Sequence, residues 1–377
     1  MKSYLLETRY FRYLLPHKAP ADKDLIYFPY WRFKGMLFWC LPGEIQNRFL
    51  DLSHQAVDTA AFPISLGLRG QAMKLKFVTP DTPGRFITPS LPFQVALDTY
   101  SARFHTDFIS KAAHEARIGE SVSLIYAPFY IEDRLYDAVL NRPVATDIPE
   151  GFDVSPLLGK HPGATLRFIP TLCPKCGWDL EGQRDSLALA CANCGSLWQT
   201  DQGGLKELTV SYLPDDGEST IYLPFWRIKA AVSGLSLGTY ADLARLANLP
   251  LVIRPEWEEN PFYFWAPAFK VRPESYLRLF THITTAQPLE KLTTGLPNAP
   301  RFSVSMPLKE SMAGMMVALA NLIKPRRAFV DNIDRIQVIP QSFRLAYLPF
   351  QDSHHEYIQP RMNLAVNKNQ LILAKNL

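Results

Sequence analysis

Two pairs of cysteines constrain this chain more than any other feature. They read Cys173-Pro174-Lys175-Cys176 and Cys191-Ala192-Asn193-Cys194. Two thiolates three positions apart can bind one metal ion from a single backbone turn, and a second pair completes the tetrahedral all-sulfur shell that structural zinc prefers. A glycine follows each pair and lets the chain fold back, so that backbone N–H groups can point at the sulfurs. We therefore expect one structural Zn²⁺ held by Cys173, Cys176, Cys191 and Cys194.

The spacing of the pairs supports this interpretation. Fourteen residues separate Cys176 from Cys191, close to the pattern of zinc sites built from two such pairs. Residues 171–198 resemble the zinc-ribbon or rubredoxin-like module, in which two cysteine turns at hairpin tips share one ion. The resemblance implies a metal site and a small β-fold but no particular activity, since ribbons serve in transcription, translation, RNA modification and protein contact. A redox dithiol, or iron in the same thiolate cage, is the alternative.

Composition and cysteine usage bound the class of protein. The chain has 377 residues, of which 47% are apolar and 20% charged, and this balance is typical of a globular protein of two or three domains. Four clustered cysteines plus Cys40, which lies in an apolar run, fit a reducing compartment better than a disulfide framework. The start of the chain lacks an apolar signal region, and no stretch approaches the roughly 18 apolar residues of a membrane span. We therefore expect a soluble cytoplasmic protein.

An aromatic strand that contains a proline recurs along the chain. It reads Tyr27-Phe28-Pro29-Tyr30-Trp31-Arg32-Phe33-Lys34 and returns as Tyr222-Leu223-Pro224-Phe225-Trp226-Arg227-Ile228-Lys229. Shorter copies read Tyr126-Ala127-Pro128-Phe129 and Tyr347-Leu348-Pro349-Phe350. Because proline cannot donate to a β-ladder, these positions predict sheet edges, strand starts or bulges.

Similar elements lie between the first and second copy in each part of the chain. Apolar residues at helical spacing predict a helix over residues 95–118 and another over 308–323. A strand is then predicted over 121–125 and over 335–339, directly before the shorter aromatic copy. The order strand, helix, strand therefore occurs twice.

This recurrence predicts an α+β protein of two similar β-rich halves, residues 1–150 and 216–377, that arose by tandem duplication. Residues 151–215, a linker rich in proline and glycine together with the four-cysteine zinc ribbon, would be inserted between them. The alternative is that aromatic strands recur because such residues are common in β-proteins.

The long copies also carry the same basic residues beside a tryptophan. Duplicated cations next to aromatic strands could form a surface for an anionic ligand or for a partner protein. In the alternative, the long stems of these side chains only cover aromatic rings at a solvent face. The candidate surface residues are Trp31, Arg32, Lys34, Trp226, Arg227 and Lys229.

Charge and missing motifs decide between function classes. Residues 151–215 hold 5 basic and 7 acidic side chains, whereas residues 216–377 hold 18 and 13, so the ribbon is not a basic phosphate-binding module. No phosphate loop, dinucleotide turn or nucleophile–base pair is present, and we predict no catalytic residue. We expect a non-enzymatic interaction or scaffold protein that binds a protein partner. Nucleic-acid binding by the basic second half, or an enzyme site between the halves, is the alternative, and the sequence specifies no oligomeric state.

Overall fold

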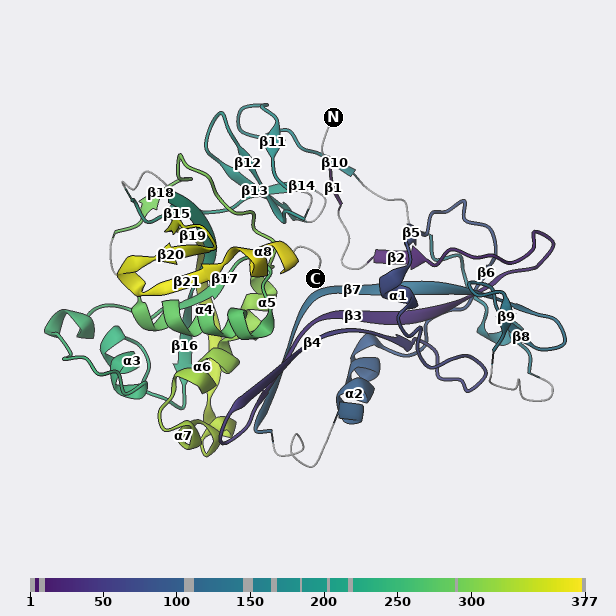
Figure 1. The fold of residues 1–377 in the computed structure, drawn as a ribbon, viewed down its shortest axis with the longest axis horizontal. Coiled ribbons are helices and arrows are strands. Elements are labelled where there is room, and N and C mark those ends of the chain that lie inside the picture. The colour runs from purple at the N-terminus through teal and green to yellow at the C-terminus, as the bar shows by residue number, and fades with distance from the viewer. Residues whose placement is uncertain are drawn as a thin grey trace.

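The chain is β-rich and forms two large sheets, accompanying helices and a small ribbon sheet (Figure 1). Among the residues described, no helix combines the length and the apolar character needed to cross a membrane. The computed structural model describes residues 4–6, 11–104, 112–144, 152–163, 168–183, 185–201, 204–215, 220–288 and 291–374.

The first large sheet is built on two long antiparallel strands, β3 (Ile26–Cys40) and β7 (His114–Ile131). Its main strand order is β4-β3-β7-β2-β5, and it also includes β6, β8 and β9. The bounds of its other strands are β2 (Phe11–Leu14), β4 (Ile45–Gln55), β5 (Lys76–Phe77), β6 (Arg85–Phe86), β8 (Leu135–Asp137) and β9 (Arg142–Pro143).

The second large sheet is built on β16 (Thr220–Ser233) and β19 (Gln337–Asp352), again antiparallel. Its main order is β17-β16-β19-β15-β18, with β20 and β21 added beyond β19. The bounds of its other strands are β15 (Val210–Tyr212), β17 (Phe264–Pro267), β18 (Thr293–Thr294), β20 (Glu356–Gln359) and β21 (Leu364–Asn367).

The two sheets follow the same plan. The strand β2 runs parallel to β7 as β15 does to β19. The remaining corresponding pairs are antiparallel in both sheets: β3 with β7 and β4, β2 with β5 and β8 with β7 and β9 in the first, and their counterparts in the second. The register also agrees, because Tyr27 lies opposite Pro128 and Tyr222 lies opposite Pro349. In each sheet the register shifts directly after the lysine of the aromatic motif, Lys34 or Lys229. A β-bulge bends a strand pair, so both strand pairs bend directly after the motif lysine.

The motif prolines do not lie at sheet edges, strand starts or bulges, so that prediction is wrong. Pro29 lies inside β3, where its carbonyl accepts the N–H of Ala56 at 2.9 Å, just beyond the end of β4. The carbonyl of Ala56 has no proline N–H to accept, and it instead accepts the N–H groups of Ser90 and Leu91, both at 2.9 Å. Proline is tolerated here because its nitrogen faces a point where the neighbouring strand has ended.

The second sheet repeats this branch point. The carbonyl of Pro224 accepts the N–H of Ala268 at 3.0 Å, and the carbonyl of Ala268 accepts the N–H groups of Ser305 and Met306 at 2.9 and 3.0 Å. The motif tryptophans then bond to the same segments. Trp31 donates its indole N–H to the carbonyl of Leu91 at 2.7 Å, and Trp226 donates to that of Met306 at 3.0 Å.

Helices begin directly after these segments, but their lengths differ from the predicted ones. The first helix, α2 (Phe93–Phe104), does not extend to residue 118, because His114 onwards belongs to β7; residues 105–111 lie outside the described part. The second is divided at Gly314 into α5 (Leu308–Ala313) and α6 (Met315–Leu322). Gly314 lies where an added Cβ would be 2.8 Å from the hydroxyl oxygen of Tyr276, so a close contact explains the glycine.

The second half contains an insertion that the first half lacks. Thirty residues, 234–263, separate β16 from β17, whereas four, 41–44, separate β3 from β4. The insertion carries α3 (Tyr240–Leu246), which begins with a capping box between Thr239 and Asp242. The remaining helices are α1 (Arg69–Ala72), α4 (Pro273–Ala286), α7 (Arg326–Val330) and α8 (Lys368–Ala374).

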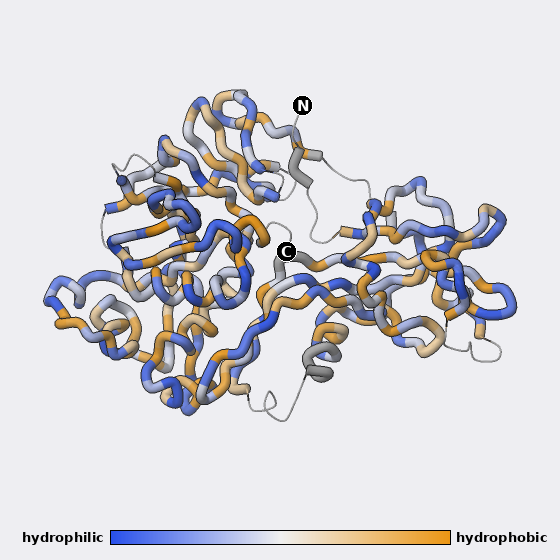
Figure 2. Tube along the Cα trace, viewed as in Figure 1, coloured by the Kyte–Doolittle hydropathy of each residue, from blue (hydrophilic) through white to orange (hydrophobic). Residues whose placement is uncertain are grey.

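The long strands of the first sheet continue into the core of the second half (Figure 1). We call residues 35–40 of β3 and 114–119 of β7 the distal arm. Its side chains alternate as strand geometry requires: Leu37 and Trp39 share a core cluster with Leu97 of α2. Met36 and Phe38 instead join the cluster that contains α4, α5, α6 and the second sheet. Figure 2 shows hydrophobic residues recurring along these strands.

A buried carboxylate lies where the distal arm contacts α5. Glu310 accepts the backbone N–H of Gly119 at 2.7 Å, next to the bulge in β7. Burial raises the pKa of Glu310, and this effect outweighs the opposing hydrogen bond from Gly119 and the charge of Lys309. Because the folded protein holds this proton more tightly than the unfolded chain does, the contribution of Glu310 to stability is largest at low pH and falls as pH rises through the folded pKa.

We predict that Glu310→Gln flattens this pH dependence. The amide keeps an oxygen for the Gly119 N–H but needs no deprotonated state, so the free energy of unfolding of the variant, relative to wild type, should rise between about pH 4 and pH 7. Urea denaturation at both pH values measures the difference. Glu274→Gln, which removes an exposed carboxylate on α4, is the control and should show no such rise. An equal difference for Glu310→Gln at both pH values would contradict the assignment.

Candidate metal centre

The two cysteine pairs lie on turns with the same backbone geometry. In the first, Cys173 donates its N–H to the carbonyl of Trp178 at 2.7 Å, and Gly177 donates to the carbonyl of Cys173 at 2.8 Å. In the second, Cys191 donates to Ser196 at 2.8 Å and Gly195 to Cys191 at 3.0 Å. Gly177 and Gly195 have φ values of 73° and 68°, the left-handed region that glycine enters without steric cost.

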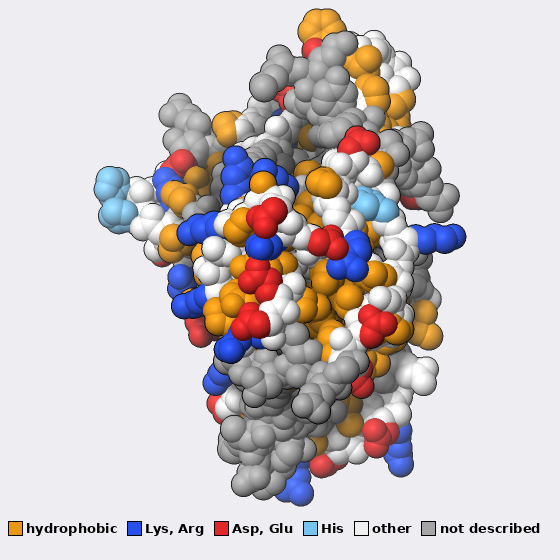
Figure 3. All heavy atoms as spheres, turned by 90° about the vertical axis from the view of Figure 1, so that its right-hand side faces the viewer, with side chains coloured by type: hydrophobic (Ala, Val, Ile, Leu, Met, Phe, Trp, Pro, Cys, Tyr) orange, Lys and Arg blue, Asp and Glu red, His pale blue; other side chains and the backbone are white. Residues whose placement is uncertain are grey.

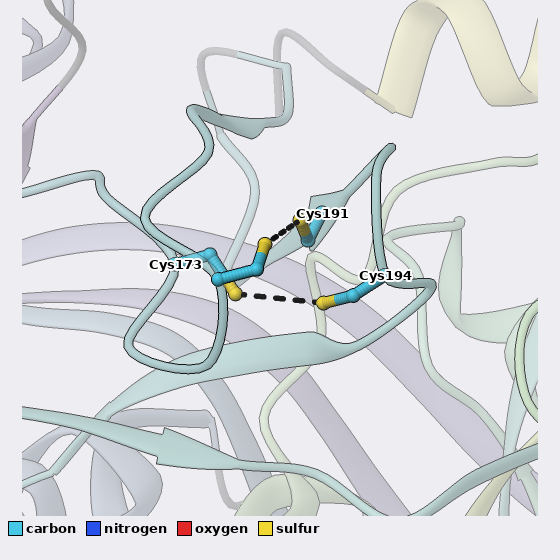
Figure 4. A group of neighbouring side chains, drawn as sticks. Cys173, Cys191 and Cys194 are labelled. Carbon is cyan, nitrogen blue, oxygen red and sulfur yellow. Dashed lines mark hydrogen bonds between the residues drawn. The ribbon is translucent and has the colours of Figure 1, made fainter.

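The four sulfur atoms lie at the distances that a shared metal ion requires. All four lie within 4.8 Å of one another; Cys173 Sγ is 3.6 Å from Cys194 Sγ, and Cys176 Sγ is 3.4 Å from Cys191 Sγ (Figure 4). A tetrahedral ion with metal–sulfur bonds of about 2.3 Å places its sulfurs about 3.8 Å apart. A disulfide would need about 2.05 Å. The cluster therefore fits a metal site better than a pair of disulfides.

The ribbon sheet supports these turns. The sulfur cluster lies against Leu180, Leu189 and Trp198, which form a small core with the cysteines. Cys173 and Cys191 are buried, Cys194 is half-buried and Cys176 is exposed, so one side of the cluster faces solvent. The strands of this sheet are β11 (Leu180–Glu181), β12 (Ala188–Cys191), β13 (Leu197–Asp201) and β14 (Gly204–Glu207), and β1 (Tyr4–Leu6) pairs with β10 (Phe168–Pro170) beside it.

Ser196 is a member of the site that the sequence analysis missed. Its hydroxyl oxygen accepts the indole N–H of Trp198 at 2.7 Å and lies 3.0 Å from Cys194 Sγ and 3.5 Å from Cys173 Sγ. With its oxygen occupied by Trp198, the hydroxyl proton is free to point at a sulfur. A polar residue two positions after the last cysteine was the only signal of this role in the sequence.

The hydrogen bonds favour thiolates at two of the sulfurs. Burial raises the pKa of Cys173, but hydrogen bonds from the Ser196 hydroxyl and from the N–H groups of Lys175 and Cys176 outweigh it and lower the pKa to about 6. The Ser196 hydroxyl likewise lowers the pKa of Cys194. Burial raises the pKa of Cys191 to about 11. The thiolate is the form that binds metal, so a cation in the cluster would hold all four sulfurs deprotonated.

The ribbon also packs against the second large sheet. Ala188, Ala190 and Leu197 belong to the main core cluster of the second half. Leu187 of the ribbon donates its N–H to the carbonyl of Val304 at 2.7 Å. The ribbon therefore shares a hydrophobic core with the second half and does not form a separately packed unit.

We predict that Cys176→Ser removes tightly bound metal and destabilises the ribbon together with its contact to the second sheet. Metal binding at such sites is worth on the order of 10 kcal/mol, and three thiolates cannot complete the shell. Elemental analysis should give about one metal ion per wild-type chain and less than a tenth of that for the variant. Hydrogen exchange should speed up over residues 171–198, including the N–H of Leu187 that bonds to the carbonyl of Val304.

The fifth cysteine supplies a control for this experiment. Cys40→Ser changes a buried thiol of the distal arm, and it should keep the full metal content. Full metal content in Cys176→Ser, or no tightly bound metal in the wild type, would contradict the site.

The structure separates the six candidate surface residues. Trp31 and Trp226 are 9% and 2% exposed, and the indole N–H of each is bonded to backbone inside its half. Both indoles are therefore core groups and not parts of a surface. They are buried because helices pack on that face of each sheet: Trp31 contacts Phe93 of α2 edge-on, with ring centroids 5.6 Å apart.

The two motif arginines have different partners. Arg32 forms a two-point ion pair with Asp51 of β4, with Nε–Oδ1 and Nη2–Oδ2 distances of 2.6 and 2.5 Å. Arg227 instead places its guanidinium carbon 3.6 Å from the centroid of the Tyr263 ring. The register puts Tyr263, just before β17, at the position that Asp51 occupies on β4.

Arg227 also faces a second cation. Arg344 lies directly opposite it on β19. Burial lowers the pKa of Arg227, and the neighbouring Arg344 adds to this effect. The remaining candidates differ as well, since Lys229 is exposed and Lys34 is half-buried. The duplicated motif thus provides a structural ion pair in the first half and a cation stacked on an aromatic ring in the second.

We predict that the two arginines contribute unequally to stability. A double-mutant cycle for Arg32→Ala and Asp51→Ala should give a coupling energy of about 2 kcal/mol, because the two-point pair is only 16% and 15% exposed. The matched cycle for Arg227→Ala and Tyr263→Ala should give roughly 0.5–1 kcal/mol, as expected for a cation–π contact. Equal coupling energies in urea unfolding would show that the two positions are equivalent.

No protein-family model, curated protein or solved structure matches the chain. The functional interpretation therefore rests on the geometry of the cysteine cluster and on the side chains that surround it. That cluster could hold a metal ion, and four protein sulfurs would leave no coordination position for a substrate.

Proposed function

We propose that this chain is a non-enzymatic scaffold that binds a protein partner, with a structural zinc ion at Cys173, Cys176, Cys191 and Cys194. The observation that carries the proposal is the first cysteine turn, on which large apolar side chains are exposed. Trp178 is 57% exposed and Leu172 is 49% exposed, and they flank the first cysteine pair. Cytoplasmic location fits this proposal, because a reducing compartment keeps the four thiols available to zinc.

An exposed tryptophan on a fixed turn is suited to anchor a partner. Tryptophan is enriched among the residues that dominate interface energetics, because its large ring fills a pocket on the partner. The turn that carries Trp178 is held by its own backbone bond to Cys173, so little chain entropy would be lost on binding. These features support binding of a protein partner at the ribbon. The regions around Trp31 and Trp226, which were the first candidates, are buried.

We also infer that the two halves arose by tandem duplication. The shared strand order, the register shift after Lys34 and after Lys229, and the branch points at Ala56 and Ala268 support this inference. The tryptophan bonds to Leu91 and Met306 support it further, because they join distant segments and not only adjacent strands. Aromatic composition alone would not produce these matched long-range bonds.

The alternatives have weaker support. A polyanion-binding surface would be rich in one sign of charge, yet in the basic second half Arg245 pairs with Glu258, Arg327 with Asp331 and Lys368 with Asp352. The outer face of the first half likewise carries positive and negative side chains interspersed (Figure 3). The ion pair of Lys23 with Glu132 is an example. An enzyme site between the halves would need a polar cleft there, but the distal arm contacts the second half through apolar residues such as Met36, Phe38 and Phe280.

The experiment that tests partner binding compares Trp178→Ala with wild type. Tagged, metal-loaded protein is cross-linked in native extract, washed at moderate salt with nuclease, and analysed by mass spectrometry. A protein partner should be recovered with cross-links to residues 171–198, and Trp178→Ala should reduce its recovery about tenfold or more, as for an interface anchor. Metal analysis of protein purified from the native extract without added metal should find zinc.

Val252→Ala is the matched control, because Val252 is 88% exposed but lies on the insertion of the second half. It should leave recovery unchanged. Equal recovery with Trp178→Ala, or loss of the partner on nuclease treatment, would overturn the protein-binding proposal. Iron in place of zinc would overturn the assignment of the metal.

A further inference from the structure

A hollow of about 640 Å³ lies in the second half, away from the cysteine cluster and from the ribbon turn. It is bordered by the insertion that carries α3, by α4, by the end of α6 and by the turn before β21, which Figure 1 shows on one side of the second sheet. We call it the α3–α4 pocket. Its volume is in the range of small-molecule sites.

The charge of the lining is one-sided. Arg278, His282, Lys324 and Arg361 line the pocket, and none of the described lining residues is an aspartate or glutamate. Arg278 and His282 lie one turn apart on α4, so both are presented from the same face of that helix. Lys324 forms no ion pair with a described residue. Lys324 and Arg278 therefore give the pocket positive charge that no described carboxylate neutralises in an ion pair.

Two of these side chains are held in place by the opposite wall. Arg278 donates from Nη2 to the carbonyl of Ala365 at 2.8 Å, and Nε2 of His282 lies 2.6 Å from the carbonyl of Met362. The imidazole must donate in this second contact, because a carbonyl oxygen only accepts. These bonds tie α4 to β21 and to the turn before it, so the floor of the pocket is preorganised.

The rest of the lining is mostly apolar or neutral. Leu249 and Leu251 come from the insertion, and Leu251 is 50% exposed. Tyr240, Leu322 and Met362 add further apolar surface, and Thr281, Thr285 and Asn321 add neutral polar groups. A wall of this kind covers the apolar body of a ligand, whereas the cations hold a charged group.

Two of the elements that build the pocket, the loop that carries α3 and the helix α4, do not belong to the repeated plan of the two sheets. The loop of residues 234–263 between β16 and β17 is far longer than the loop of residues 41–44 between β3 and β4, and α4 occupies a stretch where the first half has the single turn of α1. The shared sheet can therefore form without the pocket. Its cationic lining is an addition specific to the second half.

We propose that the α3–α4 pocket binds a small organic anion, with a carboxylate or phosphate group at Lys324 and Arg278 and an apolar body against Leu249, Leu251 and Met362. This goes beyond the scaffold function and involves none of the residues assigned to it. The concave shape and limited volume favour a small molecule over an extended polyanion, which would need a longer basic surface.

The test uses a matched pair of fluorescent probes. The anion 8-anilinonaphthalene-1-sulfonate carries an apolar body and one negative charge, and N-phenyl-1-naphthylamine is its uncharged analogue. Wild-type protein should bind about one equivalent of the anion and bind the neutral probe more weakly. Octanoate and 1-naphthyl phosphate, added as competitors, decide whether a carboxylate or a phosphate displaces the probe better.

Substitutions locate the binding site. Lys324→Met should weaken binding of the anionic probe about fivefold and leave the neutral probe unchanged, because one partly exposed cation is removed. Arg335→Met, which removes an exposed charge of the same half outside the pocket, should change neither affinity. Unchanged thermal unfolding of each variant excludes binding to a loosened core.

A second pair of variants keeps the test independent of Lys324. Leu251→Asp and Leu251→Asn have nearly the same shape at an exposed position and differ by one negative charge. The aspartate variant should bind the anionic probe about fivefold more weakly than the asparagine variant does, and the two variants should bind the neutral probe equally. The proposal would be overturned if the two variants bound the anionic probe with equal affinity, or if the wild type bound several equivalents of it. Stronger displacement of the probe by an oligonucleotide than by either small competitor would also overturn it.

Discussion

The missing N–H of one proline in each half determines how the chain is arranged around both sheets. Because Pro29 has no hydrogen to offer, the carbonyl of Ala56 is left to bind the segment at Ser90 and Leu91. That segment leads into α2, so the bond fixes where the helix starts. Trp31 then covers the junction, with its indole N–H on the carbonyl of Leu91. Pro224, Ala268 and Trp226 repeat the arrangement before α5.

Local patterns in the sequence were sufficient for part of this fold. The aromatic motifs predicted the central strands, and in the structure these strands pair tyrosine with proline in both sheets. The spacing of Cys173, Cys176, Cys191 and Cys194 predicted one compact sulfur cluster. The environment of each motif could not be predicted in this way. Whether Trp31 covers a surface or a core depends on a helix that starts 62 residues later, at Phe93. The ending of α2 before residue 118 likewise depends on long-range pairing of His114–Ile118 with β3.

The differences between the two halves carry more functional information than their similarities. At one matched position the first half has Asp51 and the second has Tyr263, which changes a fixed ion pair into a cation on an aromatic face. The insertion between β16 and β17 adds a wall where the first half has a short turn. Sheet geometry tolerates such changes in the second half, because Tyr263 and the rest of the insertion lie outside the paired ladder of β16 and β17.

The distal arm gives the two halves the relationship of subunits in an obligate dimer. Met36 and Phe38 of the first half are fully buried in the core of the second, next to Tyr276 and Phe280. Obligate partners share a core in this way and lack a stable separated state, because parting them exposes apolar surface that water does not tolerate. Here the connecting polypeptide keeps the two at a high effective concentration. If the halves arose by duplication, as proposed, a single unit of this plan would have needed a second copy of itself to bury the same apolar surface.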